Sequence, residues 1–194
     1  MYGSTMLEKK SFYFVRHGES EHNQRGLVAG GKTDSPLTEK GITQALGLKD
    51  KILAVGIEHV ISSPMIRAKK TAEIAWSGIP DIDENLREFE LAVFEGKEDK
   101  GVTEYVIDLP YDVPVPDGES KKEFVQRITC SFNKWLNTYE NPLLFVGHGF
   151  IWGILLHIME LSIYNPDGTL IADLENCRLA HFCYNGLRWE VKYL

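Results

Sequence analysis

Short apolar runs alternate with longer amphipathic stretches along the chain. Residues 11–15, 59–62 and 143–146 are mainly apolar and are bounded by polar residues, a pattern typical of buried strands. The clearest amphipathic stretch opens with Ser120 and Glu123, which have the spacing of a helix capping box. Apolar side chains then recur at helical spacing, at Phe124, Ile128, Phe132, Trp135 and Leu136. The pattern predicts buried strands separated by helices.

Capping residues indicate the boundaries of further helices. Thr38 is expected to cap a helix that continues to a stop at Gly56. Ser63 is expected to cap a second helix that runs toward Trp76. Another helix is predicted to begin at about Phe150.

The order of these elements predicts the fold. Asn185-Gly186 separates two β-like runs near the C-terminus, which is a strong hairpin signal. Strands that alternate with helices over the rest of the chain predict a mainly parallel sheet. We therefore expect one domain over residues 1–194, a three-layer α/β/α sandwich with a mainly parallel central sheet and an antiparallel C-terminal edge. The Pro-rich residues 108–118 are predicted to be a loop, and residues 89–120 are a candidate lid or cap segment.

The composition is that of a soluble globular protein. The 194 residues are 43% hydrophobic and 25% charged, and the formal net charge is -7. This charge disfavours nucleic acid and anionic membranes as partners, so an anionic substrate must meet positive charge that is concentrated locally. The longest apolar run, residues 150–159, is too short to span a bilayer, and the N-terminus lacks the apolar core of a signal peptide. The pattern does not indicate an oligomeric state.

Cysteine and histidine spacing favours neither a disulfide framework nor a metal site. The three cysteines are odd in number and lack C-x-x-C spacing, so we interpret Cys130, Cys177 and Cys183 as reduced core residues. This interpretation points to the cytoplasm. The histidines lack ligand spacing such as H-E-x-x-H, and the carboxylates are scattered, so we expect no metal and no cofactor.

One stretch matches a nucleotide-binding motif in its letters. Residues 26–33, GLVAGGKT, have the spacing of the P-loop, G-x-x-x-x-G-K-[ST]. A working P-loop joins a buried strand to a helix, because backbone amides and the helix N-terminus hold the phosphates. Here the polar residues 19–25 precede the motif, and Asp34-Ser35-Pro36, a turn sequence, follows it. We interpret the match as coincidence. An NTPase would instead require magnesium-dependent ATP cleavage that is lost when Lys32 is changed.

Two of the predicted strands run into a histidine that is followed by glycine. His17-Gly18 follows the first strand and His148-Gly149 follows the third. The carboxyl ends of parallel strands share one edge of a sheet, where ligands bind, so the two histidines are expected to face each other. Both glycines are expected to leave space for a ligand. The remaining histidines are interpreted as ordinary side chains: His22, His59, His157 and His181.

Two arginines are expected to bring positive charge to the same edge. Arg16 ends the first strand, and Arg67 lies in the first turn of the helix that follows the second strand. A guanidinium offers fixed, forked donors that suit a phosphate group. Asn23, in the short helix after the first strand, is a further candidate donor. Three other arginines are interpreted as exposed: Arg25, Arg127 and Arg188.

Paired imidazole and guanidinium groups suit phosphoryl transfer without a metal. A neutral imidazole can attack phosphorus when a hydrogen bond holds its other nitrogen, and the product is a phosphohistidine. Nearby cations stabilise the transferring oxygens. A carboxylic acid of raised pKa would then protonate the leaving alkoxide. The residues alone do not choose among Glu84, Glu88, Glu90 and Glu95 for this role.

Six stretches, in order, resemble motifs of the histidine phosphatase superfamily, also called phosphoglycerate-mutase-like. RHGESEHN at residues 16–23 resembles the signature R-H-G-E-[ST]-x-x-N, and GGKTDSPLTEKGITQA at 30–45 is similar to G-x-x-D-x-x-L-T-x-x-G-x-x-Q-A. The letters of the apparent P-loop thus overlap this second motif. The other stretches are SSPMIRAKKTAEI at 62–74, PDGES at 116–120, VGHG at 146–149 and ENCRLAHF at 175–182.

The resemblance implies a role for each matching residue. His17 is implied as the nucleophile and Glu88 as the proton donor. The implied phosphate and substrate contacts are Arg16, Asn23, Arg67, His148 and Gly149, together with the backbone amides of Gly30 and Gly31. The resemblance also implies a small phosphorylated substrate.

The chain departs from the family pattern beside the implied acid. Phosphatases of the family read E-x-x-x-G-x-x-E-G here, and Ala92 stands where the first glycine is expected. If the backbone needs a positive φ at this position, alanine strains the turn that carries Glu88.

Three functions are weighed against one another. Mutases of the family carry E-R-H-Y-G after the acid, whereas residues 88–92 read EFELA, which favours a phosphomonoesterase over a phosphoglycerate mutase. Phe89, Leu91 and Phe94 are expected either to form an apolar pocket wall or to pack in the core. A non-catalytic phosphate-binding or phosphoprotein-binding module is the third possibility, and it would not need a nucleophile and an acid together.

Overall fold

A six-stranded sheet forms the centre of the computed structural model, which describes residues 6–140, 142–161 and 174–194. The strand order is β3-β2-β4-β1-β5-β6. The strands β1 to β4 pair in parallel, and β5 and β6 continue the sheet in antiparallel orientation. This confirms the mainly parallel sheet with an antiparallel C-terminal edge. The strands are β1 (Phe12–Arg16), β2 (His59–Ser62), β3 (Asp81–Ile82), β4 (Leu143–Gly147), β5 (Leu179–Tyr184) and β6 (Trp189–Tyr193).

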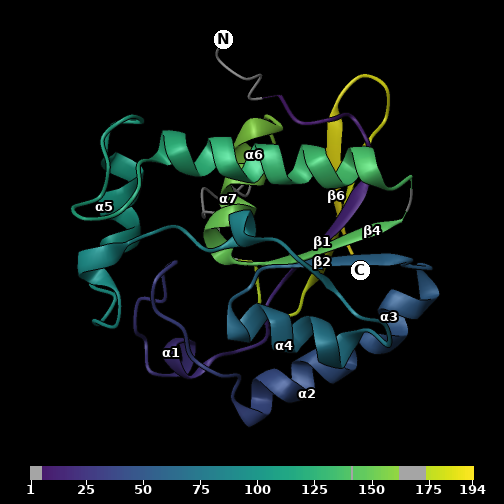
Figure 1. Cartoon of the computed structure of the whole chain (residues 1–194), viewed down its shortest axis with the longest axis horizontal. Helices are drawn as coiled ribbons and strands as arrows, with labels where there is room; N and C mark the ends of the chain where they lie inside the picture. Colours follow the sequence, from purple (N-terminus) through teal and green to yellow (C-terminus); the bar gives the residue numbers. More distant parts are fainter. Residues whose placement is uncertain (1–5, 141, 162–173) are drawn as a thin grey trace, which may run out of the picture.

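Helices cover both faces of this sheet (Figure 1). One face carries α2 (Glu39–Gly47), α3 (Lys49–Ala54) and α4 (Ile66–Ala75), and the other carries α6 (Lys121–Thr138) and α7 (Gly149–Ile158). Two short helices lie beside the sheet at the left of Figure 1, α1 (Glu21–Gln24) and α5 (Val102–Asp108). Single 3₁₀ turns occur at Glu84–Leu86 and Ala92–Phe94. The predicted α/β/α layering is therefore confirmed.

Alternating strand residues build two cores, one on each face of the sheet. Phe12 and Phe14 point toward α6 and α7, whereas Val15 points toward α2, α3 and α4, as the period of two in a strand requires. Between β4 and α6, the rings of Phe145 and Phe132 stack with centroids 3.9 Å apart. Both layers of helices are thus anchored on the strands that lead into the two histidines.

Two predicted helix starts are confirmed by their capping bonds. The Ser120 hydroxyl accepts from the Glu123 amide at 3.2 Å, and the Glu123 carboxylate accepts from the Ser120 amide at 2.9 Å. The Thr38 hydroxyl accepts from the amide of Gly41 at 3.0 Å.

Two predicted helix boundaries are wrong. The helix expected to run to Gly56 is divided into α2 and α3, because the Leu48 amide donates to the carbonyl of Ala45, three residues back, and tightens the turn. Ser63 is not the cap of α4, which begins at Ile66 after Met65. The Ser63 hydroxyl is engaged by a histidine, as described below.

The C-terminal hairpin is confirmed, but its loop is longer than a two-residue turn. Asn185, Gly186, Leu187 and Arg188 connect β5 to β6. The Asn185 side chain accepts from the amides of Leu187 and Arg188, and Gly186 has a φ of +90°. The Asn185 amide also donates to the carbonyl of Arg188 at 3.2 Å, so the side-chain bonds add to a backbone bond that closes the loop.

The cysteine interpretation holds only in part. All three cysteines are free, but Cys130 is exposed, because it lies on the face of α6 that turns away from the core. Cys177 and Cys183 are half-buried.

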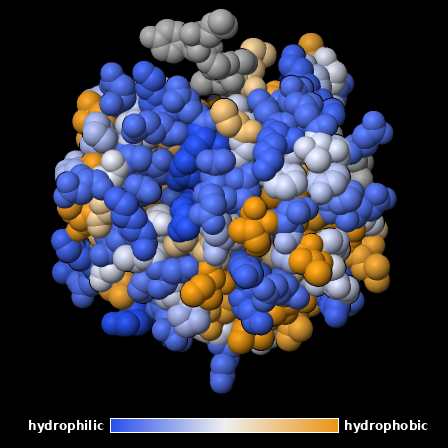
Figure 2. Space-filling view, viewed as in Figure 1, coloured by the Kyte–Doolittle hydropathy of each residue, from blue (hydrophilic) through white to orange (hydrophobic). Residues whose placement is uncertain are grey.

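The rejection of the P-loop is confirmed. Gly26 follows helix α1 and not a strand, and irregular backbone follows Thr33. The residues from Leu109 to Glu119 are irregular, as the prolines predict. Within the described part of the chain, no helix has the length and apolar character needed to cross a membrane. The face shown in Figure 2 is mainly hydrophilic, with apolar side chains scattered among polar ones.

Candidate active site

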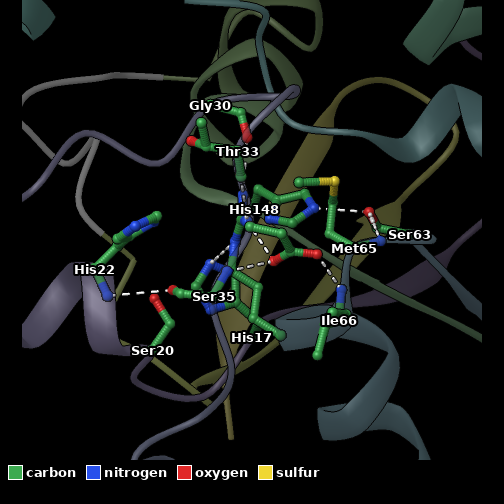
Figure 3. A network of polar contacts seen from close by, with 12 residues as sticks. His17, Ser20, His22, Gly30, Thr33, Ser35, Ser63, Met65, Ile66 and His148 are labelled. Atoms are coloured by element: carbon green, nitrogen blue, oxygen red, sulfur yellow. Dashed lines mark hydrogen bonds and ion pairs between the residues drawn. The ribbon is translucent and has the colours of Figure 1, made fainter. Parts of the chain in front are cut away.

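The two histidines come together because β1 and β4 are neighbours. Arg16 at the end of β1 lies opposite Gly147 at the end of β4, so the next residue of each strand leaves the sheet at the same level. The rings of His17 and His148 lie with centroids 5.2 Å apart and planes at 61° (Figure 3). Both side chains are buried. The two rings thus face each other, as the sequence predicts.

Hydrogen bonds define the protonation of His17. Its Nδ1 lies 2.7 Å from the carbonyl oxygen of Gly18, which can only accept, so Nδ1 carries the proton. The Nε2 atom accepts from Nε of Arg67 at 3.2 Å. Burial lowers the pKa of His17 well below its ordinary value, and the charges of Arg67 and Arg16 lower it further. His17 is therefore a neutral imidazole whose basic Nε2 faces the guanidinium.

Arg67 is fully buried at the start of α4. Its Nη1 donates to Oδ1 of Asp34 at 2.9 Å, and its Nη2 donates to the carbonyl of Gly30 at 3.2 Å. Asp34 also accepts from the amide of Ile66, the first residue of α4. Burial lowers the pKa of Arg67 from its very high ordinary value, but the guanidinium remains charged. The helix start and Asp34 together hold this cation against His17.

His148 is held by the hydroxyl of Ser63. Its Nε2 lies 2.7 Å from Oγ of Ser63, and that oxygen also accepts from the Met65 amide at 3.3 Å (Figure 3). This contact engages Nε2, whereas Nδ1 of His148 is buried and has no hydrogen-bond partner among the described residues. Burial lowers the pKa of His148 well below its ordinary value, and Arg67 and His17 add to this shift. His148 is thus a neutral ring whose Nδ1 makes no hydrogen bond to the described part of the chain.

Glu88 lies in the same cavity as Arg16 and His17. It is buried, and its Oε1 accepts from the Phe89 amide at 2.9 Å while its Oε2 accepts from the Phe150 amide in the first turn of α7 at 3.1 Å. Burial raises the pKa of Glu88, although these hydrogen bonds and the nearby arginines oppose the shift. The carboxyl group therefore holds its proton to higher pH than an exposed glutamate.

The other candidate carboxylates occupy different positions. Glu84 is exposed and pairs with Arg87, and Glu90 pairs with Lys32 at 3.4 Å. Glu95 accepts hydrogen bonds from the backbone amides of Lys32, Thr33, Leu91 and Ala92. Of these four glutamates, Glu88 alone lines the cavity.

Of four predicted ligand contacts, the structure places two, Asn23 and Gly149, in the lining of the cavity and two, Gly30 and Gly31, outside it. Asn23 lines the cavity, while its Oδ1 accepts from the Ser20 amide at 3.1 Å in the capping box of α1. Gly149 also lines it, and a Cβ there would lie 3.8 Å from Cζ of Arg16, so this glycine leaves space. The Gly31 amide already donates to the carbonyl of Phe89 at 2.9 Å. Gly30 offers its carbonyl to Arg67, and neither Gly30 nor Gly31 lines the cavity.

Gly18 has a different purpose from the one expected. A Cβ at this position would lie 2.5 Å from the carbonyl oxygen of Gly41 in α2. The glycine therefore allows α2 to pack against the turn that carries His17, and the expectation that it leaves space for a ligand is wrong.

Three residues that support the site have no assigned role in the sequence analysis. Asn176 donates from Nδ2 to the backbone carbonyl of His17 at 2.7 Å. The Thr71 hydroxyl accepts from the Gly18 amide at 2.9 Å and donates to the carbonyl of Arg67 at 2.7 Å. Arg127 is the third, and its interpretation as exposed is wrong: its side chain is 20% exposed and pairs with Glu119. The stretches that contain Thr71, Asn176 and Glu119 resemble family motifs, which was the available signal.

A cavity of about 590 Å³ opens from the two histidine-bearing strand ends. Arg16, His17, Glu88 and Gly149 line it at the sheet edge. Its remaining walls are mostly apolar: Leu27, Val28, Ala29, Phe89, Leu91, Val102, Val106, Ile107, Phe124, Phe150 and Ile154. Phe89 and Leu91 are both core residues and cavity walls, whereas Phe94 packs against the core outside the lining. Within the described ranges, no group of three His, Cys, Asp or Glu side chains is arranged to hold a metal ion.

Ala92, which stands where the family pattern has glycine, has a positive φ. Its φ is +38°, in the left-handed region, and its amide donates to Glu95 at 3.1 Å. A residue with a Cβ in this region costs on the order of 1–2 kcal/mol. We expect Ala92→Gly to raise the free energy of unfolding by about 1 kcal/mol, because part of the relief is offset by greater freedom in the unfolded chain.

Urea denaturation followed by circular dichroism measures this change. Ala54→Gly, at the exposed last residue of α3, is the matched control and is expected to lower the stability by at most about 0.5 kcal/mol, because a helix end tolerates glycine better than a helix interior does. An Ala92→Gly midpoint that falls as much as the Ala54→Gly midpoint would show that the turn is not strained.

Comparison with known proteins agrees with this geometry. The family model of the histidine phosphatase superfamily (branch 1) matches residues 12–194. The probable phosphoglycerate mutase GpmB of Cronobacter sakazakii is 33% identical over 190 residues, which cover 91% of this chain and 86% of that protein. The crystal structure of phosphoglycerate mutase from Thermus thermophilus is 28% identical, with a TM-score of 0.71, and covers 95% of this chain and 98% of that one. A putative alpha-ribazole-5'-P phosphatase from Escherichia coli, 21% identical with a TM-score of 0.74 and 96% of both chains covered, shares the fold.

Proposed function

The chain belongs to the histidine phosphatase superfamily (branch 1), and from this premise we propose that it is a metal-independent phosphomonoesterase that acts through a phosphohistidine. In the proposed reaction, Nε2 of His17 attacks the phosphorus of the ester. The bond to the leaving oxygen breaks, and Glu88 gives that oxygen its proton. The Glu88 carboxylate then takes a proton from water, whose oxygen attacks the phosphohistidine and releases phosphate.

The cations around His17 suit the charge that this reaction develops. Arg16 lines the cavity and the Arg67 guanidinium faces His17, and we propose that His148 donates to the phosphoryl group from Nδ1, which has no hydrogen-bond partner among the described residues. Donors that are already in place stabilise the transferring oxygens without reorganisation, and each is typically worth a hundred- to a thousandfold in rate. Asn23 at the cavity edge is proposed as a further contact to the phosphoryl group.

The choice of a phosphatase depends on one observation, the composition of the cavity beyond the phosphoryl site. A phosphoglycerate carries a carboxylate in addition to its phosphate, and a mutase must hold both. Among the described lining residues, Arg16 and Lys121 are the cationic side chains, and the Lys121 ammonium donates to the carbonyl of Ile107 at 2.8 Å. Asp99 and Glu104 add negative charge to the same lining. This wall favours a phosphate ester with a weakly charged, largely apolar organic group.

A phosphoglycerate mutase is the second candidate, because two of the three proteins compared above bear that name. The two candidates differ in what attacks the phosphohistidine, water or a hydroxyl of the substrate. A kinetic panel of 1-naphthyl phosphate and 3-phosphoglycerate, assayed in the presence of EDTA, separates them. We expect kcat/KM for naphthyl phosphate to be at least about tenfold higher, since burial of a ring in an apolar pocket is worth more than about 1.4 kcal/mol.

The same panel includes an assay for 2-phosphoglycerate. Interconversion of the phosphoglycerates that outpaces release of phosphate would establish the mutase and refute the phosphatase. Binding of both esters with no turnover of either would indicate a phosphate-binding module.

A further inference from the structure

The guanidinium of Arg127 is directed at the backbone that carries Glu88. From helix α6, its Nη1 donates to the carbonyls of Asn85 at 2.7 Å and Arg87 at 2.8 Å. Its Nη2 donates to the carbonyl of Glu88 itself at 2.9 Å. One side chain thus bonds to three backbone carbonyls of the segment that ends at Glu88.

Glu119 holds the other side of the same segment. Its two oxygens form a forked pair with Arg127, with Nε to Oε2 at 2.9 Å and Nη2 to Oε1 at 2.5 Å. The Oε1 atom also accepts from the amide of Glu90 at 2.9 Å. The ion pair between Arg127 and Glu119 therefore bonds to backbone groups both at Glu88 and two residues beyond it.

Packing keeps this arrangement away from water. The Arg127 guanidinium lies 4.7 Å from the ring centre of Phe124, and that ring meets Phe89 edge-on at 5.0 Å. The Arg127 and Glu119 side chains are only 20% and 12% exposed. Ion pairs of low exposure and forked geometry hold their position better than single-contact surface pairs.

We propose that Arg127, held by Glu119, is a positioning residue for the carboxyl group of Glu88. This inference rests on the proposed function, in which Glu88 protonates the leaving oxygen. The carboxyl oxygens of Glu88 bond to the amides of Phe89 and Phe150, so movement of the segment shifts the first of these bonds and the distance to the leaving group. A displacement of about 1 Å in a catalytic group costs on the order of a hundredfold in rate.

Arg127→Lys tests this assignment, because lysine keeps the charge and loses the fork. The test compares kcat/KM for an alkyl phosphate, whose leaving group needs a proton, with that for 2,4-dinitrophenyl phosphate, whose leaving group does not. We expect a loss of about 10- to 100-fold for the alkyl ester and of less than about threefold for the dinitrophenyl ester. Arg188→Lys is the matched control, since the Arg188 side chain in the loop between β5 and β6 is 76% exposed and pairs with Glu190, and it is expected to change neither value.

A second measurement does not depend on turnover. The titration of the Glu88 carboxyl carbon, followed by ¹³C NMR, is expected to show a raised pKa in the wild-type protein. In Arg127→Lys, water is expected to reach the carboxyl group and the pKa to return toward the ordinary value of glutamate. If Arg127 had a purely structural role, Arg127→Lys would lower kcat/KM equally for both esters and would leave the pKa of Glu88 unchanged.

Two outcomes would overturn the assignment. One is an equal loss on both esters in a folded Arg127→Lys protein. The other is an unchanged Glu88 titration in that variant or, if it does not fold, in Glu119→Gln. Failure of the wild-type protein to hydrolyse either ester would count against the proposed function, while the titration would still test the positioning of Glu88.

Discussion

Replacement of His17 by alanine is expected to reduce phosphate release by on the order of 10⁴-fold or more, because loss of the nucleophile removes the covalent route. The Nε2 atom of His17 is basic, uncharged at neutral pH and faces the Arg67 guanidinium, whereas Nε2 of His148 is engaged by the Ser63 hydroxyl. Rapid mixing with ³²P-labelled ester, followed by an alkaline quench and peptide mapping, measures the intermediate directly. The label is expected on the peptide that contains residue 17.

The control for this experiment is a histidine outside the cavity. His59 begins β2 and stacks on Tyr139 with ring centroids 3.7 Å apart. His59→Gln is expected to keep both the label and wild-type turnover. Label on a different residue, or wild-type turnover in His17→Ala, would refute His17 as the nucleophile.

Glu88→Gln is expected to lower kcat/KM for alkyl phosphates by about 10²- to 10⁴-fold, the usual contribution of a general acid. The amide keeps the size of the side chain but has no proton to give at a useful pKa. The loss for 2,4-dinitrophenyl phosphate is expected to be much smaller. Glu90→Gln, two residues on and paired with Lys32, is the matched control.

The pKa shifts of His17 and Glu88 set the direction in which kcat/KM changes with pH. The lowered pKa of His17 means that the nucleophile is already neutral well below the ordinary pKa of histidine, so kcat/KM rises with pH through that lowered pKa. The raised pKa of Glu88 means that the acid form persists to higher pH, and kcat/KM falls as pH rises through it. We expect the wild-type profile to be bell-shaped and the falling limb to be absent in Glu88→Gln. A falling limb that persists in Glu88→Gln would assign the acid to another group.

Local sequence signals were enough to predict the frame of the site. The runs that become β1 and β4 end directly at His17 and His148, and parallel pairing brings these ends together. The capping box of α6 was visible for the same reason, since its bonds span three residues. The two-residue strand β3 has too few residues to show a period.

The supporting contacts could not be predicted, because they connect segments that are distant in the chain. Arg127 looked like an exposed residue of an amphipathic helix, and only the folded chain brings the carbonyl of Glu88 to its guanidinium. The choice of Glu88 among four glutamates likewise depends on which side chain is buried at the cavity, and the neighbouring residues in the sequence do not predict that burial. Ser63 was interpreted wrongly as a cap, because its hydroxyl contacts the ring of His148, which directly follows β4.

The parallel pairing of β1 with β4 has a consequence for how the protein regains its activity after denaturation. Residues 17–142 separate these two strands in the sequence, so their pairing closes a very long loop. Such non-local pairing is slow to form. A refolding intermediate in which only neighbouring helices and turns have formed would have no assembled pair of imidazoles. The rate at which turnover recovers would therefore report the pairing of β1 with β4. The helical circular dichroism signal would recover earlier, as the helices form.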